Sequence, residues 1–445
     1  MSPDPTYSLP MRFGLSLLAT FLLCCAACTT SSGGQTGVDR PAAALDRDGG
    51  LGDTAAEAGA DASVLDATEP DAAPPDAGRG DARAADPQRF VAAAHLLTAR
   101  SSHSSTLLAD GRVLVVGGFG ASGRPLASTE LFDPLSGQWT PGPTMDEPRA
   151  NHVALRLPSG QVLIAGGGLD NDVGAPAGRG ILSSAVLFDP ADGSLVNVAP
   201  LSQGRSHAAA TLLEDGRALV SGGSSGAHTT QPTFGDALGT SEIYDPSVDR
   251  WTPGPALSIP RYLHSALRLR GGEVAVVGGA DQTEAELRPI EILRPSDGAR
   301  RDGPSLSVGR VFHAALELPS GRALVVCGKQ ANIRFLSSGE LLAADGSEIS
   351  ETLALPADSR TGATLSLLPS GRALLVGGLH GSPAGFYPLA DAYLYDEDGA
   401  TWTAIGGLAE PRVLHSATVL QGGSVLVCGG LSGQDTLGSC ERSSH

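Results

Sequence analysis

The alternation of apolar and polar residues from residue 89 onward predicts short β-strands joined by tight turns. In the first copy of the pattern, residues 103–108 form an apolar strand, Asp110-Gly111 is typical of a two-residue hairpin turn, and residues 112–116 form a second strand. This second strand is continuously apolar, so we expect both of its faces to be covered. A third strand is predicted over residues 128–132, and a fourth begins near Trp139.

The same pattern occurs seven times, with a mean period of about 52 residues that is typical of propeller blades. An arginine precedes each copy, at positions Arg100, Arg149, Arg205, Arg261, Arg310, Arg360 and Arg412. A glycine pair ends each second strand except in the fifth copy, where Cys327-Gly328 stands. We expect glycine there because a side chain would collide with the neighbouring blade or because φ must be positive.

The two ends of the repeat region are expected to complete one blade together. The seventh copy ends after Cys440-Glu441 and lacks a fourth strand. Phe90 lies as far before Arg100 as Trp139 lies before Arg149, so residues 89–95 are expected to form the missing fourth strand. The sequence therefore predicts an all-β, seven-bladed propeller over residues 89–445, closed by an N-terminal strand that leaves no open sheet edge.

Several copies share a longer motif around the third strand. It comprises Glu130 to Pro134 followed by Trp139, Glu242 to Pro246 followed by Trp251, and in part Tyr395-Asp396 followed by Trp402. With the glycine pairs, this motif resembles the kelch repeat. We name the strands of each blade a to d in chain order. The resemblance implies that partners dock on the face formed by the b–c loops, over the mouth of the central channel.

The N-terminal 88 residues are instead typical of a signal and a tether. Arg12 precedes the apolar run 13–23, and Cys25-Ala26-Ala27-Cys28 follows. This order resembles a bacterial lipobox and implies a signal peptide over residues 1–27 and a lipidated Cys28. An ordinary cleaved signal, and therefore a secreted chain, is the alternative. Residues 28–88 are rich in Ala, Asp, Pro and Gly and predict a disordered acidic linker. The expected location is the cell envelope, at the periplasmic face of the outer membrane or at the cell surface.

Histidines recur three residues after the repeat arginines, at His103, His152, His264, His313 and His415. His207 is displaced by one position, and Ala363 stands there in the sixth copy. Histidines on innermost strands could bind a metal in the channel. A position that recurs in most blades more often serves the blade itself, for instance through a ring N–H bonded to a backbone carbonyl. We therefore predict no metal site and no cofactor.

The repeat arginines are expected to pair with acids of the third strands, Glu130, Glu242, Glu291, Glu340 and Glu441. Val186 and Tyr393 interrupt this series, which leaves Arg149 and Arg360 as candidate free cations for binding. Among the cysteines, Cys428 and Cys440 flank a predicted hairpin and are expected to form a disulfide in an exported chain. Cys327 is expected to be a buried free thiol.

A copper oxidase of the galactose oxidase type is the catalytic alternative, because some secreted propellers with kelch-like repeats are such enzymes. That site needs two histidines and two tyrosines, one of them cross-linked to a cysteine. Tyr244 and Tyr395 occupy the third-strand aromatic position, which indicates packing, and the chain contains no Tyr-His pair. The sequence therefore favours a protein without catalysis.

The charge and the loops indicate what the propeller would bind. A net charge of −18 with the single lysine Lys329 disfavours nucleic acid as a partner. The b–c loops of the second and third copies are long, and such loops concentrate binding residues. The candidate binding residues there are Asp170, Asp172, Arg179, His228, Phe234 and Asp236. We expect a monomeric binding module for a protein or glycan, in contact with a membrane only through its lipid. An envelope adhesin or spacer without a single ligand is a further alternative.

Overall fold

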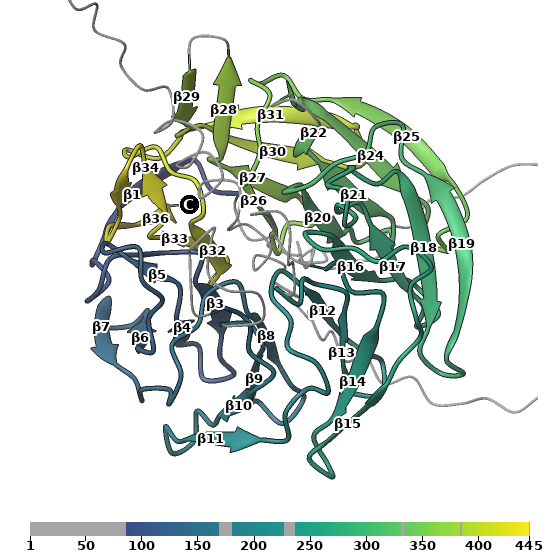
Figure 1. Cartoon of the computed structure of the whole chain (residues 1–445). Coiled ribbons are helices and arrows are strands. Elements are labelled where there is room, and N and C mark those ends of the chain that lie inside the picture. The colour runs from purple at the N-terminus through teal and green to yellow at the C-terminus, as the bar shows by residue number, and fades with distance from the viewer. Residues whose placement is uncertain (1–85, 169–179, 227–235, 331–333, 383–384, 445) are drawn as a thin grey trace, which may run out of the picture. The chain divides into compact units, whose positions relative to one another are not determined.

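The computed structural model describes residues 86–168, 180–226, 236–330, 334–382 and 385–444 (Figure 1). Every regular element within these residues is a β-strand. The strands form seven four-stranded antiparallel sheets and four two-stranded ones. The predicted signal peptide, Cys28 and almost all of the predicted linker lie outside the described residues.

The first blade has the four predicted strands, but its first turn differs from the prediction. The strands β3 (Ser104–Leu107), β4 (Val113–Val116), β6 (Thr129–Asp133) and β7 (Gln138–Pro141) pair in this order. In the turn, the N–H of Gly111 donates to the carbonyl of Leu108 at 3.1 Å, and Gly111 has a φ of 91°. The loop therefore has three residues and ends in a glycine bulge, which a two-residue turn would not contain.

The other six blades repeat this sheet. They comprise β8 (Val153–Arg156), β9 (Val162–Ala165), β10 (Ala185–Phe188) and β11 (Leu195–Val198); β12 (Ala209–Leu212), β13 (Ala218–Ser221), β14 (Ser241–Asp245) and β15 (Arg250–Pro253); β16 (Ser265–Arg268), β17 (Val274–Val277), β18 (Pro289–Arg294) and β19 (Ala299–Ser305); β20 (Ala314–Glu317), β21 (Ala323–Val326), β24 (Ser338–Leu342) and β25 (Ile349–Ala354); β26 (Thr364–Leu367), β27 (Ala373–Val376), β30 (Ala392–Asp396) and β31 (Thr401–Ile405); and β32 (Ser416–Val419), β33 (Val425–Cys428), β36 (Cys440–Ser444) and β1 (Arg89–Ala93).

The blades form a closed ring. Their innermost strands contact one another in the order β3, β8, β12, β16, β20, β26 and β32, and β32 lies beside β3 again. The second strand of every blade is buried along its whole length, as its continuous apolar sequence predicted. The described residues therefore form a seven-bladed β-propeller, in which each blade packs between two others (Figure 1).

The N-terminal strand closes the ring, as the sequence predicted. β1 pairs antiparallel with β36, from Arg89 opposite Ser444 to Ala93 opposite Cys440. Phe90 on β1 is 8% exposed and packs in the core shared by the sixth and seventh blades. The carbonyl of Gln88 also accepts a hydrogen bond from the N–H of Gly406 in the sixth blade, at 3.0 Å. Both termini of the propeller therefore contribute strands to one sheet.

The glycine pairs hold neighbouring blades at close range. At Gly117, φ is +59° and a Cβ atom would overlap the backbone carbonyl of Arg149 in the next repeat. The next residue, Gly118, donates its N–H to that same carbonyl at 2.9 Å. Equivalent bonds of 2.9–3.0 Å join all seven pairs of adjacent blades. Both reasons expected for these glycines therefore apply.

Candidate functional site

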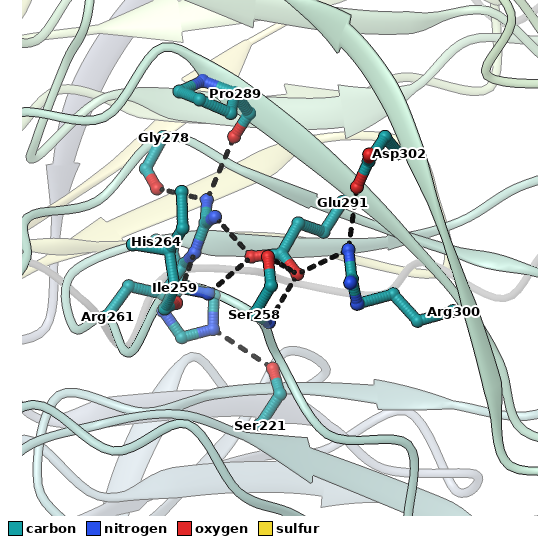
Figure 2. A network of polar contacts seen from close by, with 10 residues as sticks. All are labelled: Ser221, Ser258, Ile259, Arg261, His264, Gly278, Pro289, Glu291, Arg300 and Asp302. Carbon is teal, nitrogen blue, oxygen red and sulfur yellow. Dashed lines mark hydrogen bonds and ion pairs between the residues drawn. The ribbon is translucent and has the colours of Figure 1, made fainter.

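Each repeat arginine is buried and holds the b and c strands of its own blade. In the fourth blade, Arg261 donates from Nη1 to the carbonyls of Gly278 at 3.0 Å and Pro289 at 3.1 Å. Its Nη2 donates to Glu291 Oε1 at 2.6 Å (Figure 2). Burial lowers the pKa of Arg261 below its ordinary value, and Glu291 opposes that shift. The guanidinium is therefore fully engaged inside the blade.

The partner carboxylate is engaged as well. Glu291 Oε2 accepts from the backbone N–H of Ser258 at 2.7 Å and from its hydroxyl at 2.9 Å. Glu291 Oε1 accepts from the N–H of Ile259 at 3.2 Å (Figure 2). These N–H groups belong to the d–a loop that leads into the blade. A buried ion pair persists only when its remaining hydrogen bonds are satisfied, and this network meets that requirement.

Five blades contain this arginine–glutamate pair, as the sequence predicted. The distances are 2.5 Å for Arg100–Glu130, 2.5 Å for Arg205–Glu242, 2.6 Å for Arg261–Glu291, 2.7 Å for Arg310–Glu340 and 3.0 Å for Arg412–Glu441. None of these ten side chains is more than 5% exposed. They are part of the scaffold rather than of a binding surface.

The expectation that Arg149 and Arg360 are free cations is wrong. Arg149 is 1% exposed and donates to the Ser184 hydroxyl at 2.9 Å, with Glu147 at 3.7 Å. Burial lowers the pKa of Arg149 to about 10. Arg360 donates to both carboxylate oxygens of Asp391 at 2.7 Å. In both blades the acid comes from a loop instead of the third strand, so its absence from the strand did not leave the arginine unpaired.

The recurring histidines join adjacent blades through hydroxyl groups. Nε2 lies 2.8–3.0 Å from a serine or threonine oxygen of the preceding blade in five cases: His103–Ser416, His152–Ser104, His264–Ser221, His313–Ser265 and His415–Thr364. The structural interpretation is confirmed, with side-chain hydroxyls as the partners of Nε2 in these five blades. Burial lowers the pKa of His152, His313 and His415 to about 3, so these rings are neutral at pH 7.

The exceptions follow the same contact. Ala363 replaces the histidine of the sixth blade, and the preceding blade has Ala314 where a hydroxyl would stand. Ala208 replaces it in the third blade, where the preceding blade has Val153. The displaced His207 instead lies 2.7 Å from the hydroxyl of Ser206. In these two blades the histidine and its hydroxyl partner are both absent, whereas His264 is kept and bonds to Ser221 on the neighbouring strand of the third blade. Both observations fit a role at the blade interface.

The candidate oxidase tyrosines also serve packing. Tyr244 and Tyr395 are fully buried, and each ring lies 5.0 Å from the tryptophan of its own blade. Within the described ranges, no group of three or more histidine, cysteine or acidic side chains is arranged to hold a metal ion. The described residues contain no helix that is long and apolar enough to cross a membrane.

The cysteines of the propeller fall into two kinds. Cys428 on β33 and Cys440 on β36 face each other and form a disulfide with an S–S distance of 2.09 Å. The bond lies within the blade that closes the ring. Cys327 is a buried free thiol at a glycine position with a φ of 62°. Burial raises the pKa of Cys327 to about 12, which makes it a poor nucleophile.

Most of the candidate binding residues of the long b–c loops cannot be placed. Asp170, Asp172, Arg179, His228 and Phe234 lie outside the described residues, and Asp236 is exposed at the edge of its loop. Three described b–c loops form hairpins: β22 (Lys329–Gln330) with β23 (Arg334–Phe335), β28 (Leu379–Ser382) with β29 (Gly385–Pro388), and β34 (Leu431–Ser432) with β35 (Asp435–Thr436). In the first blade, β5 (Phe119–Gly120) of the b–c loop pairs instead with β2 (Arg100–Ser101), which precedes strand a.

One exposed feature of the b–c face was not predicted from the sequence. Phe386 and Tyr387 on β29 are 39% and 46% exposed, the highest values of any aromatic side chain in the described residues. The available signal was the Gly-Ser-Pro-Ala-Gly stretch between Leu379-His380 and Phe386-Tyr387, which is typical of a hairpin turn. The surface that the described residues offer to a partner therefore includes an aromatic hairpin on the sixth blade.

The comparisons with known proteins agree with this architecture. The model of the kelch motif matches residues 100–146, which run from the first repeat arginine to beyond strand d of the first blade. The fold is a kelch-type β-propeller. Alpha-scruin of Limulus polyphemus is 26% identical over 193 residues, which cover 43% of this chain and 20% of that protein. Human Kelch-like protein 33 is 31% identical over 147 residues, which cover 33% of this chain and 25% of that protein.

A solved structure shares the propeller over a larger part of the chain. It is a fungal alcohol oxidase of the AA5 family in complex with copper, with a TM-score of 0.61. The match covers 81% of this chain and 76% of that one, at 14% sequence identity. At this identity the likeness shows the fold alone. The chain spans about a quarter or less of the two curated relatives, so their activities as whole proteins do not transfer to it.

Proposed function

We propose that this protein is a non-catalytic binding module of the bacterial cell envelope, tethered to a membrane through Cys28, which binds its partner on the b–c face of a kelch-type propeller. The main support is that the recurrent arginines and histidines form hydrogen bonds within and between the blades, so they are not available to bind a partner. The b–c loops, by contrast, differ from blade to blade in length and composition. A rigid ring with variable loops on one face is the usual arrangement for recognition.

The tether is proposed from the sequence. Cys28 follows a basic and apolar segment, and about 60 residues of acidic linker separate it from the propeller. A flexible chain of this length spans on the order of 40 Å, which would hold the head away from the membrane surface. Multiple acyl chains on one cysteine would make the anchoring stable.

The face used for binding can be tested by site-specific photo-crosslinking in a bacterium that makes the protein. A photoreactive residue at Gln434, on the b–c face, is compared with one at Leu135, in the c–d turn at the opposite end of the strands. The proposal expects a defined adduct from Gln434 and none from Leu135. The proposed binding face would be contradicted if adducts formed only from Leu135, or if no adduct formed from any of several positions on the b–c face.

The tether is tested separately, by fractionation and mass spectrometry. The wild-type chain should enter the membrane fraction and yield an acylated peptide that begins at Cys28. The Cys28→Ser variant should become soluble or remain unprocessed. A soluble wild-type chain cleaved elsewhere would replace the tether with the secreted alternative and leave the binding face unaffected.

A further inference from the structure

The hairpin β28–β29 stands out among the described b–c loops. Each of its strands is four residues long, whereas β22, β23, β34 and β35 in the flanking blades are two residues long. The hairpin extends beyond its neighbours at the rim of the ring (Figure 1). Phe386 and Tyr387 are consecutive on β29, so their side chains point to opposite faces of the hairpin.

Both rings are held in place by aromatic neighbours. The ring of Phe386 lies 5.8 Å from that of Phe335 on β23. A Cβ atom at Gly381 would overlap both of these rings, so only glycine permits the packing. On the other face, Tyr387 lies 4.9 Å from His380, whose Nδ1 is 2.8 Å from the carbonyl of Ser359. Two half-exposed rings are thus presented on a fixed support, which reduces the entropy lost on binding.

The rim around these rings is polar and carries both signs of charge. Arg334 on β23 is exposed, and β23 lies beside β28. Asp358 is exposed next to Ser359, which holds His380. Asp435 on β35 is exposed in the next hairpin, whose β34 lies beside β29. No single charge dominates, so the surroundings favour a ligand without net charge that can both donate and accept hydrogen bonds.

The exposed apolar area is confined to the two rings. In the described parts of the flanking hairpins β22–β23 and β34–β35, no large apolar side chain is exposed. A protein interface of ordinary size buries about 800 Å² per partner around a dry apolar centre, and this rim offers no such centre. A sugar ring presents an apolar C–H face that stacks on an aromatic ring, and hydroxyls that bond to charged side chains at its edge.

We propose that the aromatic hairpin of the sixth blade binds an uncharged oligosaccharide, through stacking of a sugar ring on Tyr387 and hydrogen bonds to the polar rim formed by Arg334, Asp358 and Asp435. This inference rests on the proposed binding function and assigns the ligand class of the same face. The carboxylates of Asp358 and Asp435 accept hydrogen bonds, and the guanidinium of Arg334 donates them. Sugar hydroxyl groups can both donate and accept, so they can pair with all three side chains.

The test is calorimetric titration of the purified full chain with cellohexaose, chitohexaose, maltohexaose and xylohexaose. At least one is expected to bind, and Tyr387→Ala should weaken that binding tenfold or more. Tyr387→Phe retains the ring and should stay within about threefold of wild type. Leu135→Ala, which removes an exposed apolar side chain at a c–d turn, is the matched control and should change nothing.

Three results would overturn the inference. One is the absence of binding to every sugar in the panel. Another is sugar binding that is unaffected by Tyr387→Ala and Phe386→Ala. The third is a protein adduct at the b–c face that Tyr387→Ala abolishes while no sugar binds, since this result would retain the proposed function and assign the hairpin to a protein. Unchanged thermal melting of the variants would show that each is folded.

Discussion

The buried arginine–glutamate pair allows a quantitative test within one chain, because the same arginine position has two kinds of acid. Glu291 is 2% exposed and satisfies both Arg261 and the d–a loop. Glu147 is 46% exposed and lies 3.7 Å from Arg149. We compare Glu291→Gln with Glu147→Gln, which remove the same charge from a buried and from a largely exposed site.

The expected magnitudes differ several-fold. Removing one partner of a buried pair leaves an uncompensated charge and costs about 3–5 kcal/mol. Glu147 remains largely in water at 3.7 Å from the buried Arg149, so we expect its removal to cost only as much as the loss of an exposed pair, about 0–1 kcal/mol. Unfolding entropy is about 2 cal/mol/K per residue, so a propeller of about 360 residues should lose roughly 4–7 °C in Tm for Glu291→Gln. Glu147→Gln should lower the Tm by roughly 1 °C or less.

The assay is thermal and urea unfolding of both variants and the wild type, with the m-value as a check that the same structure unfolds. Equal, small shifts would refute the reasoning, because they would mean that Arg261 finds other compensation without Glu291. A large shift for Glu147→Gln would refute it as well, since the exposed carboxylate would then matter more than its solvation allows.

Three further perturbations follow from the fold. The pKa of His152 is about 3 in the folded state and about 6.5 when unfolded, so between these pH values the unfolded chain binds more protons. The free energy of unfolding should therefore fall by about 1.4 kcal/mol per pH unit for this residue as the pH drops below 6.5. Urea titrations at pH 7 and pH 5 should show that the double variant His152→Ala, Ser104→Ala lacks this part of the pH dependence. Phe90→Ala should cost about 3–5 kcal/mol by urea unfolding, and a cost below 1 kcal/mol would mean that β1 is dispensable for closure. Replacing Cys428 and Cys440 by serine should lower the free energy of unfolding by about 3 kcal/mol, and an unchanged urea midpoint would contradict the loop-entropy argument.

Much of the scaffold followed from periodicity, since strand lengths, glycine pairs and repeat arginines recur at fixed offsets. The partners of those residues were less accessible. Glu147 and Asp391 replace the third-strand acid from loops, and a periodic pattern does not show which loop residue reaches a guanidinium across space. The periodic pattern therefore located all seven repeat arginines, but the prediction that Arg149 and Arg360 lack an acidic partner was wrong.

The histidine partners were visible in the sequence but were not recognised. In several repeats a serine directly follows the histidine, as in His103-Ser104, yet that serine bonds to the histidine of the next blade. The contact crosses from one repeat to the next, so it appears only once the blades are placed side by side. The exposure of Phe386 and Tyr387 on the aromatic hairpin could not be predicted for a related reason, because exposure depends on how far a loop extends beyond its neighbours.

The closure of the ring also constrains how the chain reaches its native state. Arg89 lies opposite Ser444, 355 residues later, so the first strand to be synthesised has the last as its partner. Blades one to six consist of sequence-local strands and are able to assemble as they emerge, whereas β1 stays unpaired with Phe90 exposed until the C-terminus is complete. During this interval the nascent chain presents an open strand and an apolar side chain, and it is then most prone to aggregation and most in need of a chaperone.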